Sequence, residues 1–343
     1  MNEKDNIILE TIDLKAYFHL DEGILKAVDG VDLKIKEGKT LGIVGESGCG
    51  KSVTGQSLMR IVPNPGKVEG QILLHKRENG DDKCTVDLVK LESKGQEIHD
   101  IRGGDIAMIF QEPMKAFSPI HTIGNQIIEG ILLHVTKDPK EARDLALDVL
   151  KRVDMPNAEQ RLDEYPHQLS GGMRQRAMIA MALSCNPSIL IADEPTTALD
   201  VTVQAQVLKL INELKENIKT SVIFITHDLG VIAEMSDDVA VMYLGKVMEY
   251  TDVDTLFHGA LHPYTIALLQ SIPSITKEAK TDLEVIEGIV PFPMNLPKGC
   301  GFYSRCKRAK DGLCNVSDIP LVEVEEDHFV RCIRVDTKKQ WGK

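Results

Sequence analysis

The chain has 343 residues, of which 43% are hydrophobic, and it carries a formal net charge of −12 at pH 7. This length exceeds one average domain and predicts two or three compact units. The excess of acidic residues argues against nonspecific nucleic-acid binding. No apolar run approaches the ~20 residues that span a bilayer. Residues 1–5 lack the basic start and apolar core of a signal peptide, so we expect a chain that stays in the cytoplasm.

The first hundred residues alternate between strand-like apolar segments and turns. Strands are expected over residues 7–12, 31–35 and 68–74, and Asn79-Gly80 predicts the tip of a hairpin. The octet Gly45-Glu46-Ser47-Gly48-Cys49-Gly50-Lys51-Ser52 follows the apolar run Leu41-Gly42-Ile43-Val44 and precedes a segment able to form a helix. This order of strand, loop and helix is the setting of a phosphate-binding loop.

Each residue type in this octet has a physical role in phosphate binding. Glycines let successive backbone N–H groups turn toward phosphate oxygens, and the start of the helix adds partial positive charge. Lys51 reaches the β- and γ-phosphates, and the Ser52 hydroxyl can ligate Mg²⁺.

The middle of the chain turns from strand-like to helical and back. Residues 112–185 have helical periodicity, as in 140–153 and 173–183, and they contain the pentapeptide Leu169-Ser170-Gly171-Gly172-Met173. Residues 186–257 return to strand and helix alternation, which predicts that they close a parallel sheet. Gly245-Lys246 predicts a hairpin turn at its end.

Two apolar runs in this last region end in polar residues with catalytic potential. Ser188-Ile189-Leu190-Ile191-Ala192 reads as a buried parallel strand and leads into Asp193 and Glu194. Asp193 would hold Mg²⁺ through water, and Glu194 could polarise the water that attacks a γ-phosphate. The next run, residues 221–226, ends in His227, a candidate for a γ-phosphate contact.

With these motifs together, the chain resembles the ATP-binding subunit of an ATP-binding-cassette (ABC) transporter. The pentapeptide 169–173 resembles the signature that separates this family from other phosphate-loop NTPases. The resemblance implies an α/β fold: a RecA-like parallel-sheet core, an antiparallel β subdomain and a helical subdomain at about 112–185. It also implies a head-to-tail pair of cassettes in which Ser170, Gly171 and Gly172 face the γ-phosphate held by the opposite subunit.

The resemblance assigns further roles position by position. Glu194 matches the catalytic carboxylate, His227 the switch histidine, and Gln111 the glutamine that touches Mg²⁺ and couples to the membrane subunits, together with the stretch 114–119. Asp200 matches a loop that crosses the dimer interface. The residues expected to bind ATP are Phe18, Gly45, Glu46, Ser47, Gly48, Cys49, Gly50, Lys51, Ser52 and Val53, with Mg²⁺ held by Ser52, Gln111 and Asp193.

Two of these positions carry open questions. Leu14, Ala16 and Phe18 would share one face of an early strand, which favours Phe18 as the aromatic that stacks on adenine; Tyr17 is the alternative. Cys49 stands where many relatives carry a small residue such as Ser. We expect nucleotide binding to survive this change, with a liability to oxidation.

Residues 258–343 differ from a generic cassette. The segment His262-Pro263-Tyr264-Thr265-Ile266-Ala267-Leu268-Leu269 resembles one found in the dipeptide/oligopeptide (peptide/nickel) importer branch, in its D-type subunit. This predicts two parts, a nucleotide-binding domain over 1–257 and a small Cys-rich C-terminal domain or extension over 258–343.

The extension contains four cysteines, Cys300, Cys306, Cys314 and Cys332, within a segment at about 288–335. Four thiolates suit an iron–sulfur cluster or a structural zinc; four reduced cysteines in a small core are the alternative. Arg305, Lys307, Arg308 and Lys310 lie beside them in sequence and would favour thiolates. The resemblance favours a [4Fe–4S] cluster, with Zn²⁺ as the alternative.

The sequence thus predicts an ATPase that powers import of di- and oligopeptides from the cytoplasmic face of the membrane. Its partners would be a second, related ABC ATPase subunit, two transmembrane permeases and, indirectly, an external peptide-binding protein. The alternatives are the same role in an importer of nickel or another small solute, and a non-transport ABC ATPase. The latter class usually has two cassettes in one chain or a long coiled coil, and the sequence shows neither.

Overall fold

The computed structural model describes residues 6–78, 82–197, 200–272, 286–294, 296 and 298–335. The chain divides into two compact units. The unit that we call the helical unit comprises residues 1–6, 36–39 and 90–224, and the P-loop unit comprises residues 7–35, 40–89 and 225–343. We describe each by itself.

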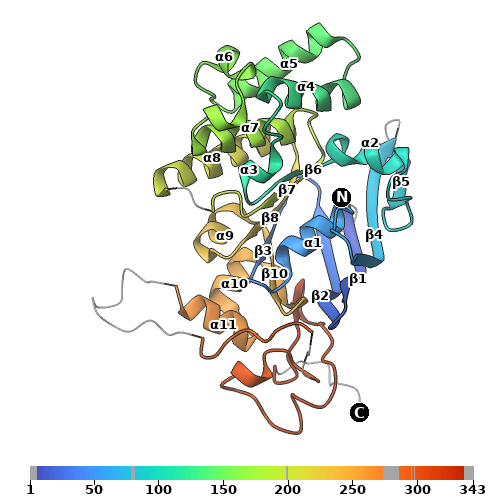
Figure 1. Cartoon of the computed structure of the whole chain (residues 1–343). Helices are drawn as coiled ribbons and strands as arrows, with labels where there is room; N and C mark the ends of the chain where they lie inside the picture. The colour runs from blue at the N-terminus through green and yellow to red at the C-terminus, as the bar shows by residue number, and fades with distance from the viewer. Residues whose placement is uncertain are drawn as a thin grey trace. The chain divides into compact units, whose positions relative to one another are not determined.

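The P-loop unit contains an antiparallel sheet and a mixed sheet (Figure 1). Its strands are β1 (Ile7–Leu20), β2 (Gly23–Lys36), β3 (Thr40–Val44), β4 (Gly66–Glu78), β5 (Asp82–Asp87), β9 (Asp238–Tyr243), β10 (Lys246–Asp252), β11 (Val322–Glu325) and β12 (His328–Val330). Its helices are α1 (Lys51–Leu58), α9 (Leu229–Met235), α10 (Val253–Gly259), α11 (Pro263–Gln270) and the 3₁₀ turn η3 (Tyr303–Arg305).

The order of strands confirms the expected antiparallel subdomain. One sheet runs β2-β1-β4-β5, and β4 pairs with β5 as the predicted hairpin, whose tip Asn79-Gly80 lies outside the described residues. The part of the other sheet that belongs to this unit runs β11-β12-β10-β9-β3, with β3 parallel to β9 and the remaining pairs antiparallel. The predicted turn between β9 and β10 is present, with Leu244 and Gly245 both at positive φ.

The helical unit contains short parallel strands and most of the helices. Its strands are β6 (Ile106–Ile109), β7 (Ile189–Asp193) and β8 (Ser221–Thr226), of which the last two residues belong to the P-loop unit. Its helices are α2 (Gln96–Gly104), α3 (Pro113–Ala116), α4 (Ile123–His134), α5 (Pro139–Arg152), α6 (Ala158–Leu162), η2 (Pro166–Gln168), α7 (Gly171–Leu183) and α8 (Val201–Ile218).

Strands β3, β6, β7 and β8 are buried along their whole length, as the apolar runs predicted. All five residues of β3 and of β7 are buried, and β6 pairs with β7 in parallel register. Strands covered on both faces need no alternation of polar and apolar residues. In the helical unit, α4, α5, α6 and α7 gather into one group (Figure 1). Within the described ranges, no helix combines the length and apolarity that crossing a bilayer requires.

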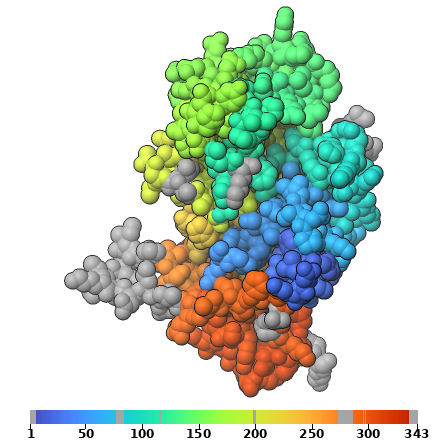
Figure 2. Space-filling model, in the orientation of Figure 1, coloured from blue at the N-terminus to red at the C-terminus, as the bar shows by residue number. Residues whose placement is uncertain are grey.

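Residues after 257 are built into the P-loop unit. Strand β12 extends the sheet by pairing with β10, where Tyr250 lies opposite Phe329. The backbone N–H of Lys26 in β2 donates to the carbonyl of Pro293 at 3.2 Å. In the space-filling view, the orange and red C-terminal residues lie against the blue N-terminal strands of the same unit (Figure 2). The division at residue 257 stays a prediction.

A buried carboxylate anchors the first helix of this extension. Glu249 of β10 is fully buried and accepts hydrogen bonds from the backbone N–H of Leu261 at 2.7 Å, the N–H of His262 at 3.0 Å and Nε2 of His328 at 2.8 Å. Burial alone would raise the pKa of Glu249, but the hydrogen bonds lower it on balance. His262 caps α11, because its Nδ1 accepts from the N–H of Tyr264.

Burial lowers the pKa of His262 to about 4 from 6.5. Between pH 6.5 and 4 the unfolded chain therefore binds a proton that the folded chain does not, so folding stability falls on acidification, by roughly 3 kcal/mol at most. His262→Asn keeps a capping side chain and should flatten this acid-side loss in thermal unfolding measured from pH 7 to pH 4.5. The exposed His258, changed to Asn, serves as the control. Equal pH dependence in His262→Asn and the wild type would contradict the assignment.

Candidate nucleotide-binding site

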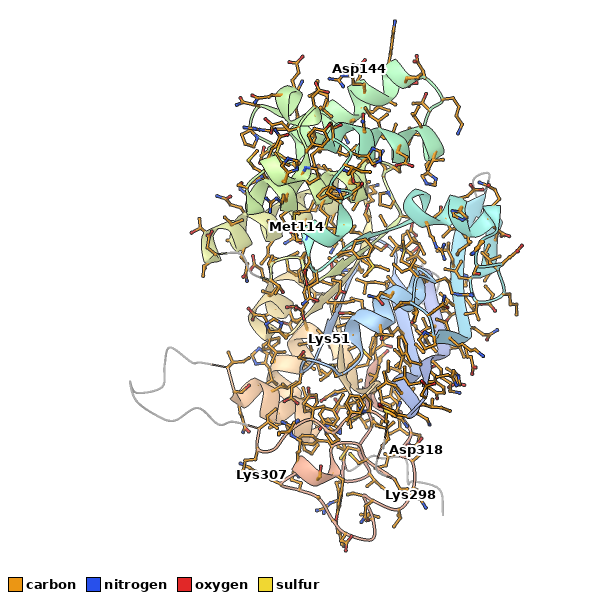
Figure 3. The ribbon with its side chains drawn as sticks, viewed as in Figure 1. Lys51, Met114, Asp144, Lys298, Lys307 and Asp318 are labelled. Carbon is orange, nitrogen blue, oxygen red and sulfur yellow. The ribbon has the colours of Figure 1, made fainter. Side chains whose placement is uncertain are left out.

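The predicted phosphate-binding loop connects β3 to α1. Strand β3 ends at Val44, and α1 begins at Lys51 after Gly50, which has φ 99° (Figure 3). Ser47 and Gly48 are exposed at the turn of the loop. The strand, loop and helix order predicted from the octet is confirmed.

Two glycines of the loop are required by close backbone contacts. A Cβ on Gly45 would lie 2.2 Å from the carbonyl oxygen of Met242, and one on Gly50 would lie 2.1 Å from that of Ala27. Real Cβ atoms do not approach oxygen this closely, and both glycines have positive φ. The backbone of β2 and β9 thus leaves no room for a side chain at Gly50 and Gly45, two of the glycines of the phosphate-binding motif.

The ammonium group of Lys51 is held inside the loop. Its side chain is buried, and Nζ donates to the carbonyl oxygens of Gly45 at 2.9 Å and Glu46 at 3.1 Å. A buried ammonium needs hydrogen-bond acceptors to offset its lost hydration. The first two carbonyls of the loop therefore orient the cation that the motif assigns to the phosphates.

Cys49 departs from its expected behaviour. Its side chain has no exposed surface, and burial raises the pKa of its thiol. Since the thiolate is the reactive form, the expected liability to oxidation is not supported. Cys49 contributes its backbone, with its carbonyl accepting from the N–H of Gly245.

The two aromatic candidates for adenine differ in environment. Leu14 and Ala16 are buried, and Phe18, on the same face of β1, is half-buried opposite Gly66 of β4. The Tyr17 hydroxyl donates to Asp29, and the ammonium of Lys26 lies 5.4 Å from its ring centroid. Tyr17 is thus already in contact with Asp29 and Lys26. Phe18 remains the favoured candidate, and its stacking on adenine stays a prediction.

The helical unit positions the predicted acidic residues at the end of β7. Asp193, its last residue, is buried, and Glu194 has φ 45°, a left-handed conformation that is uncommon for a residue with a side chain. Such conformations concentrate at functional sites. Gln111 donates through Nε2 to Oε2 of Glu194 at 2.9 Å, and the Thr197 hydroxyl donates to the same oxygen at 2.9 Å.

These contacts bring Gln111 and Glu194 together across 83 residues of sequence. Two donors on one oxygen fix the orientation of the carboxylate. Thr197 is a contact that the sequence analysis missed.

The signature glycines start α7. Ser170 is the N-cap and accepts from the N–H of Met173 at 3.4 Å. A Cβ on Gly171 would meet nothing within 4 Å, and one on Gly172 would meet only Val203 Cγ1 at 3.5 Å. Packing within the helical unit therefore does not require glycine at either position, in contrast to Gly45 and Gly50. The buried Gln175 donates to the carbonyl of Pro195 and so ties α7 to the segment after Glu194.

Asp200 and His227 each precede a helix. Asp200 caps α8 by accepting from the N–H of Val203 at 3.0 Å. His227 lies between β8 and Asp228, which caps α9. The P-loop unit thus holds residues 45–53, Phe18 and His227, whereas the helical unit holds Gln111, residues 170–172, Asp193, Glu194 and Asp200.

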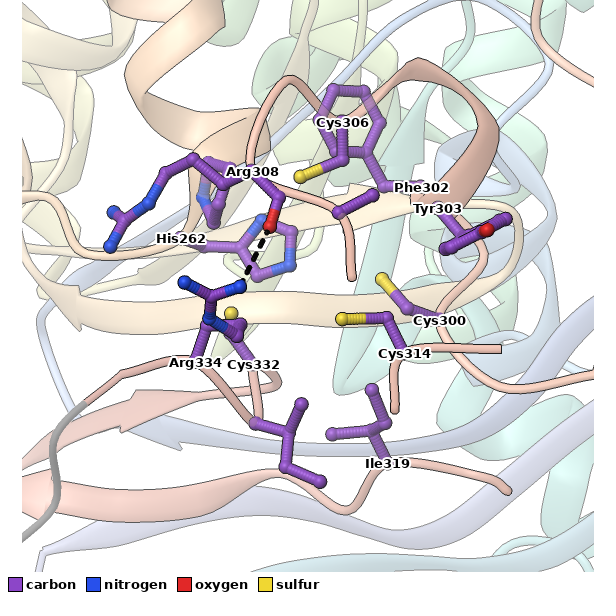
Figure 4. Close-up of a pocket in the computed structure, with 13 residues that line it drawn as sticks. His262, Cys300, Phe302, Tyr303, Cys306, Arg308, Cys314, Ile319, Cys332 and Arg334 are labelled. Carbon is purple, nitrogen blue, oxygen red and sulfur yellow. Dashed lines mark hydrogen bonds between the residues drawn. The ribbon is translucent and has the colours of Figure 1, made fainter. Parts of the chain in front are cut away.

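The four cysteines of the extension converge on one small cavity. Cys300, Cys306, Cys314 and Cys332 line a space of about 20 Å³ (Figure 4). All four are free thiols, and in the described part of the chain no group of three or more His, Cys, Asp or Glu side chains has a metal-binding arrangement. The side-chain geometry of the described residues therefore does not support the expected cluster or zinc.

Burial outweighs the effect of the neighbouring basic residues on the cysteines. Burial raises the pKa of Cys300 to about 11 and raises the pKa of Cys306 and Cys332. Arg308 lowers the pKa of Cys306 and Cys332 as predicted, but burial raises it by more. The side chain of Arg305 instead contacts Glu46 of the loop, at 2.6 Å and 3.0 Å.

Arg305 and Tyr264 are contacts of the loop that the sequence analysis missed. The Tyr264 hydroxyl accepts a hydrogen bond from the N–H of Glu46 at 2.9 Å. In the sequence, the only signals were that Tyr264 lies in the segment 262–269 and that Arg305 precedes Cys306.

Comparisons with known proteins agree with this geometry. Residues 28–197 match the ABC transporter family, and residues 248–314 match the oligopeptide/dipeptide transporter C-terminal region. The chain is 49% identical to the oligopeptide transport ATP-binding protein AppD of Bacillus subtilis, over 95% of this chain and 96% of that protein.

The chain belongs to the ABC transporter family. It is also 45% identical to a probable peptide ABC transporter ATP-binding protein of Sinorhizobium fredii, over 97% of this chain and 96% of that one. It is 44% identical to the oligopeptide transport ATP-binding protein OppD of Salmonella typhimurium, over 90% and 89%. The predicted membership of the peptide branch is confirmed.

Solved structures show the same cassette fold. The ATP-binding cassette MJ0796, as a dimer in a post-hydrolysis state with ADP and Pi, has a TM-score of 0.61 and 27% identity, covering 71% of this chain and 98% of that one. The predicted P-loop ATPase fold is therefore confirmed, whereas a separate Cys-rich C-terminal domain is not.

The glycine environments predict opposite effects of two alanine substitutions. Gly50→Ala places a Cβ against a backbone carbonyl at positive φ and should lower the free energy of unfolding by roughly 1–3 kcal/mol. Gly171→Ala enters open space and should change it by less than about 0.5 kcal/mol. Urea unfolding of both variants, monitored by circular dichroism, measures the difference. Similar losses in the two would contradict the assignment of their environments.

Proposed function

We propose that the chain is the ATP-binding and ATP-hydrolysing subunit of an importer of di- and oligopeptides, acting at the cytoplasmic face of the membrane. The observation that carries the ATPase is the loop in which Gly45 and Gly50 are forced by backbone contacts and Lys51 is held by two carbonyls. Peptide as the solute is supported by the extension and by relatives whose names specify peptide transport.

The residues have separable roles in hydrolysis. Lys51 and the amides of residues 45–53 hold the phosphates, and Phe18 stacks on adenine. Ser52, Gln111 and Asp193 would hold Mg²⁺, since hydroxyl, amide and carboxylate oxygens are its preferred ligands. Mg²⁺ when bound neutralises charge on the β- and γ-phosphates.

Glu194 orients the attacking water and accepts its proton, with the carboxylate held by Gln111 and Thr197. His227 supports the γ-phosphate. Asp200 belongs to the loop at the interface between two cassettes.

The site is completed by a second cassette. Ser170, Gly171 and Gly172 present a helix start with no Cβ contact at Gly171, which suits the approach of a phosphate from outside the chain. We infer a paired subunit, a paralogue of this chain, in which each signature faces the nucleotide bound by the other. A monomer should accordingly hydrolyse ATP slowly.

The closing movement of the two cassettes must be transmitted to two permeases, which receive solute from an external binding protein. The stretch 114–119 follows Gln111, and the side chains of Met114 and Ile120 are exposed, at 46% and 76%. Exposed apolar residues beside a catalytic glutamine suit a coupling surface.

Import of nickel or another small solute by the same assembly is the second candidate, and transport assays with peptides and Ni²⁺ separate the two.

Glu194→Gln should reduce ATP turnover by roughly 10²–10⁴-fold, because the neutral amide is a poor proton acceptor, while ATP binding persists. Phosphate release and binding of a fluorescent ATP analogue are the two measurements. Glu216→Gln, an exposed change on α8, should leave both unaltered. Near-normal turnover in Glu194→Gln would remove Glu194 from the catalytic role.

We propose separately that the extension holds a [4Fe–4S] cluster, with Zn²⁺ as the alternative, because four thiols converge on one cavity. We derive no step of the reaction through it. Protein purified without oxygen should contain about four irons and four sulfides per chain, lost in a Cys300→Ser/Cys306→Ser variant and kept in Cys185→Ser. Zinc without sulfide would favour a structural site. Absence of both metals would leave four reduced thiols and end the proposal.

A further inference from the structure

Glu46, the second residue of the phosphate-binding loop, is held at three points. Its carboxylate accepts two hydrogen bonds from Arg305, Nη1 to Oε2 at 2.6 Å and Nη2 to Oε1 at 3.0 Å. Its backbone N–H donates to the Tyr264 hydroxyl, and its carbonyl accepts from Nζ of Lys51. Arg305 and Tyr264, both in the C-terminal extension, thus contact the residue whose carbonyl holds the Lys51 ammonium.

Arg305 is itself firmly placed. Only 4% of its side chain is exposed, compared with 26% for Glu46. Its guanidinium also donates to the Tyr243 hydroxyl and to the carbonyls of Ile286 and Glu287. A planar guanidinium bonded to both carboxylate oxygens fixes the orientation of the carboxylate as well as its position.

Tyr264 is placed by a cluster of aromatic rings. Its ring centroid lies 4.7 Å from that of Tyr243 in β9 and 5.2 Å from that of Phe302, and all three residues are buried. Arg305 lies 5.9 Å from the rings of Tyr243 and Phe302. The two contacts to Glu46 therefore come from one packed cluster that joins the sheet to the extension.

We propose that Arg305 and Tyr264 are positioning residues for nucleotide binding. They fix Glu46, so that its carbonyl and that of Gly45 hold the Lys51 ammonium in place. Arg305 also neutralises the Glu46 carboxylate, which would otherwise present a negative charge to the nucleotide phosphates. The inference rests on the proposed binding of ATP by this loop and assigns to the extension a part in it.

Loss of either contact should weaken nucleotide binding. Arg305→Ala leaves the carboxylate uncompensated and should raise the Kd for Mg·ADP about tenfold, in the range expected for a charged hydrogen bond. Arg305→Lys keeps the charge without the bidentate geometry and should give a smaller rise. Tyr264→Phe keeps the ring packing but removes the acceptor for the Glu46 N–H, and it should also raise the Kd.

The interaction between Arg305 and Glu46 is tested by a double-mutant cycle. If Arg305 acts through Glu46, Arg305→Ala should change the Kd by less than about twofold in a Glu46→Ala background, because the two effects are not additive for residues in contact. Arg308→Ala, an exposed arginine three residues away, is the control and should leave binding unchanged.

The experiment uses the full-length chain with Mg·ADP as the probe in titration calorimetry, which avoids hydrolysis. Thermal unfolding of each variant separates folding from binding. In steady-state assays of Arg305→Ala, KM for ATP should rise while kcat at saturating ATP stays close to wild type. A lower unfolding temperature with an unchanged Kd would indicate a purely structural role and overturn the inference.

Additive effects in the cycle would also overturn it. Should Arg305→Ala fail to fold, Tyr264→Phe and Glu46→Ala carry the test, and an unchanged Kd in both would overturn the inference. A wild-type chain that binds neither ADP nor ATP would instead reject the proposed function. A wild type that binds, with variants that bind equally well, rejects only the roles of Arg305 and Tyr264.

Discussion

A buried ammonium is the constraint on which this structure depends. Lys51 lies inside the loop between β3 and α1, where lost hydration must be offset by hydrogen bonds. The carbonyls of Gly45 and Glu46 supply these bonds, and they can do so only because Gly45 and Gly50 allow the chain to curl against β9 and β2. The same curl presents backbone N–H groups to phosphate, so stability and nucleotide recognition share one geometry.

The extension is part of this arrangement. Glu249 holds the start of α11, β12 pairs with β10, and the rings of Tyr243, Tyr264 and Phe302 pack together. Aromatic clusters of this kind combine large buried area with defined ring geometry. Two residues of the extension, Tyr264 and Arg305, therefore lie against the phosphate-binding loop.

The glycines of the chain divide into two physical classes. Gly45 and Gly50 are dictated by atoms of this chain, whereas Gly171 has open space where a side chain would be. A small residue without an internal reason points to an external one, and a helix start is suited to bind an anion. This open helix start is compatible with the proposed pair of cassettes, in which an anion would approach from outside the chain.

The order of the motifs determined the family, the cassette fold and the buried strands, because glycine spacing and apolar periodicity are local properties of the chain. The motifs assigned roles to Gln111 and Glu194 separately, but they did not predict the hydrogen bond between the two. Local sequence did not predict the contact of Arg305 with Glu46, which lie 259 residues apart. It also suggested that the cysteines of the extension are thiolates, whereas burial raises the pKa of Cys300 and so favours its thiol form. These features were decided by tertiary structure, since burial and the direction of a side chain depend on residues that meet only when the sheet and the extension pack together.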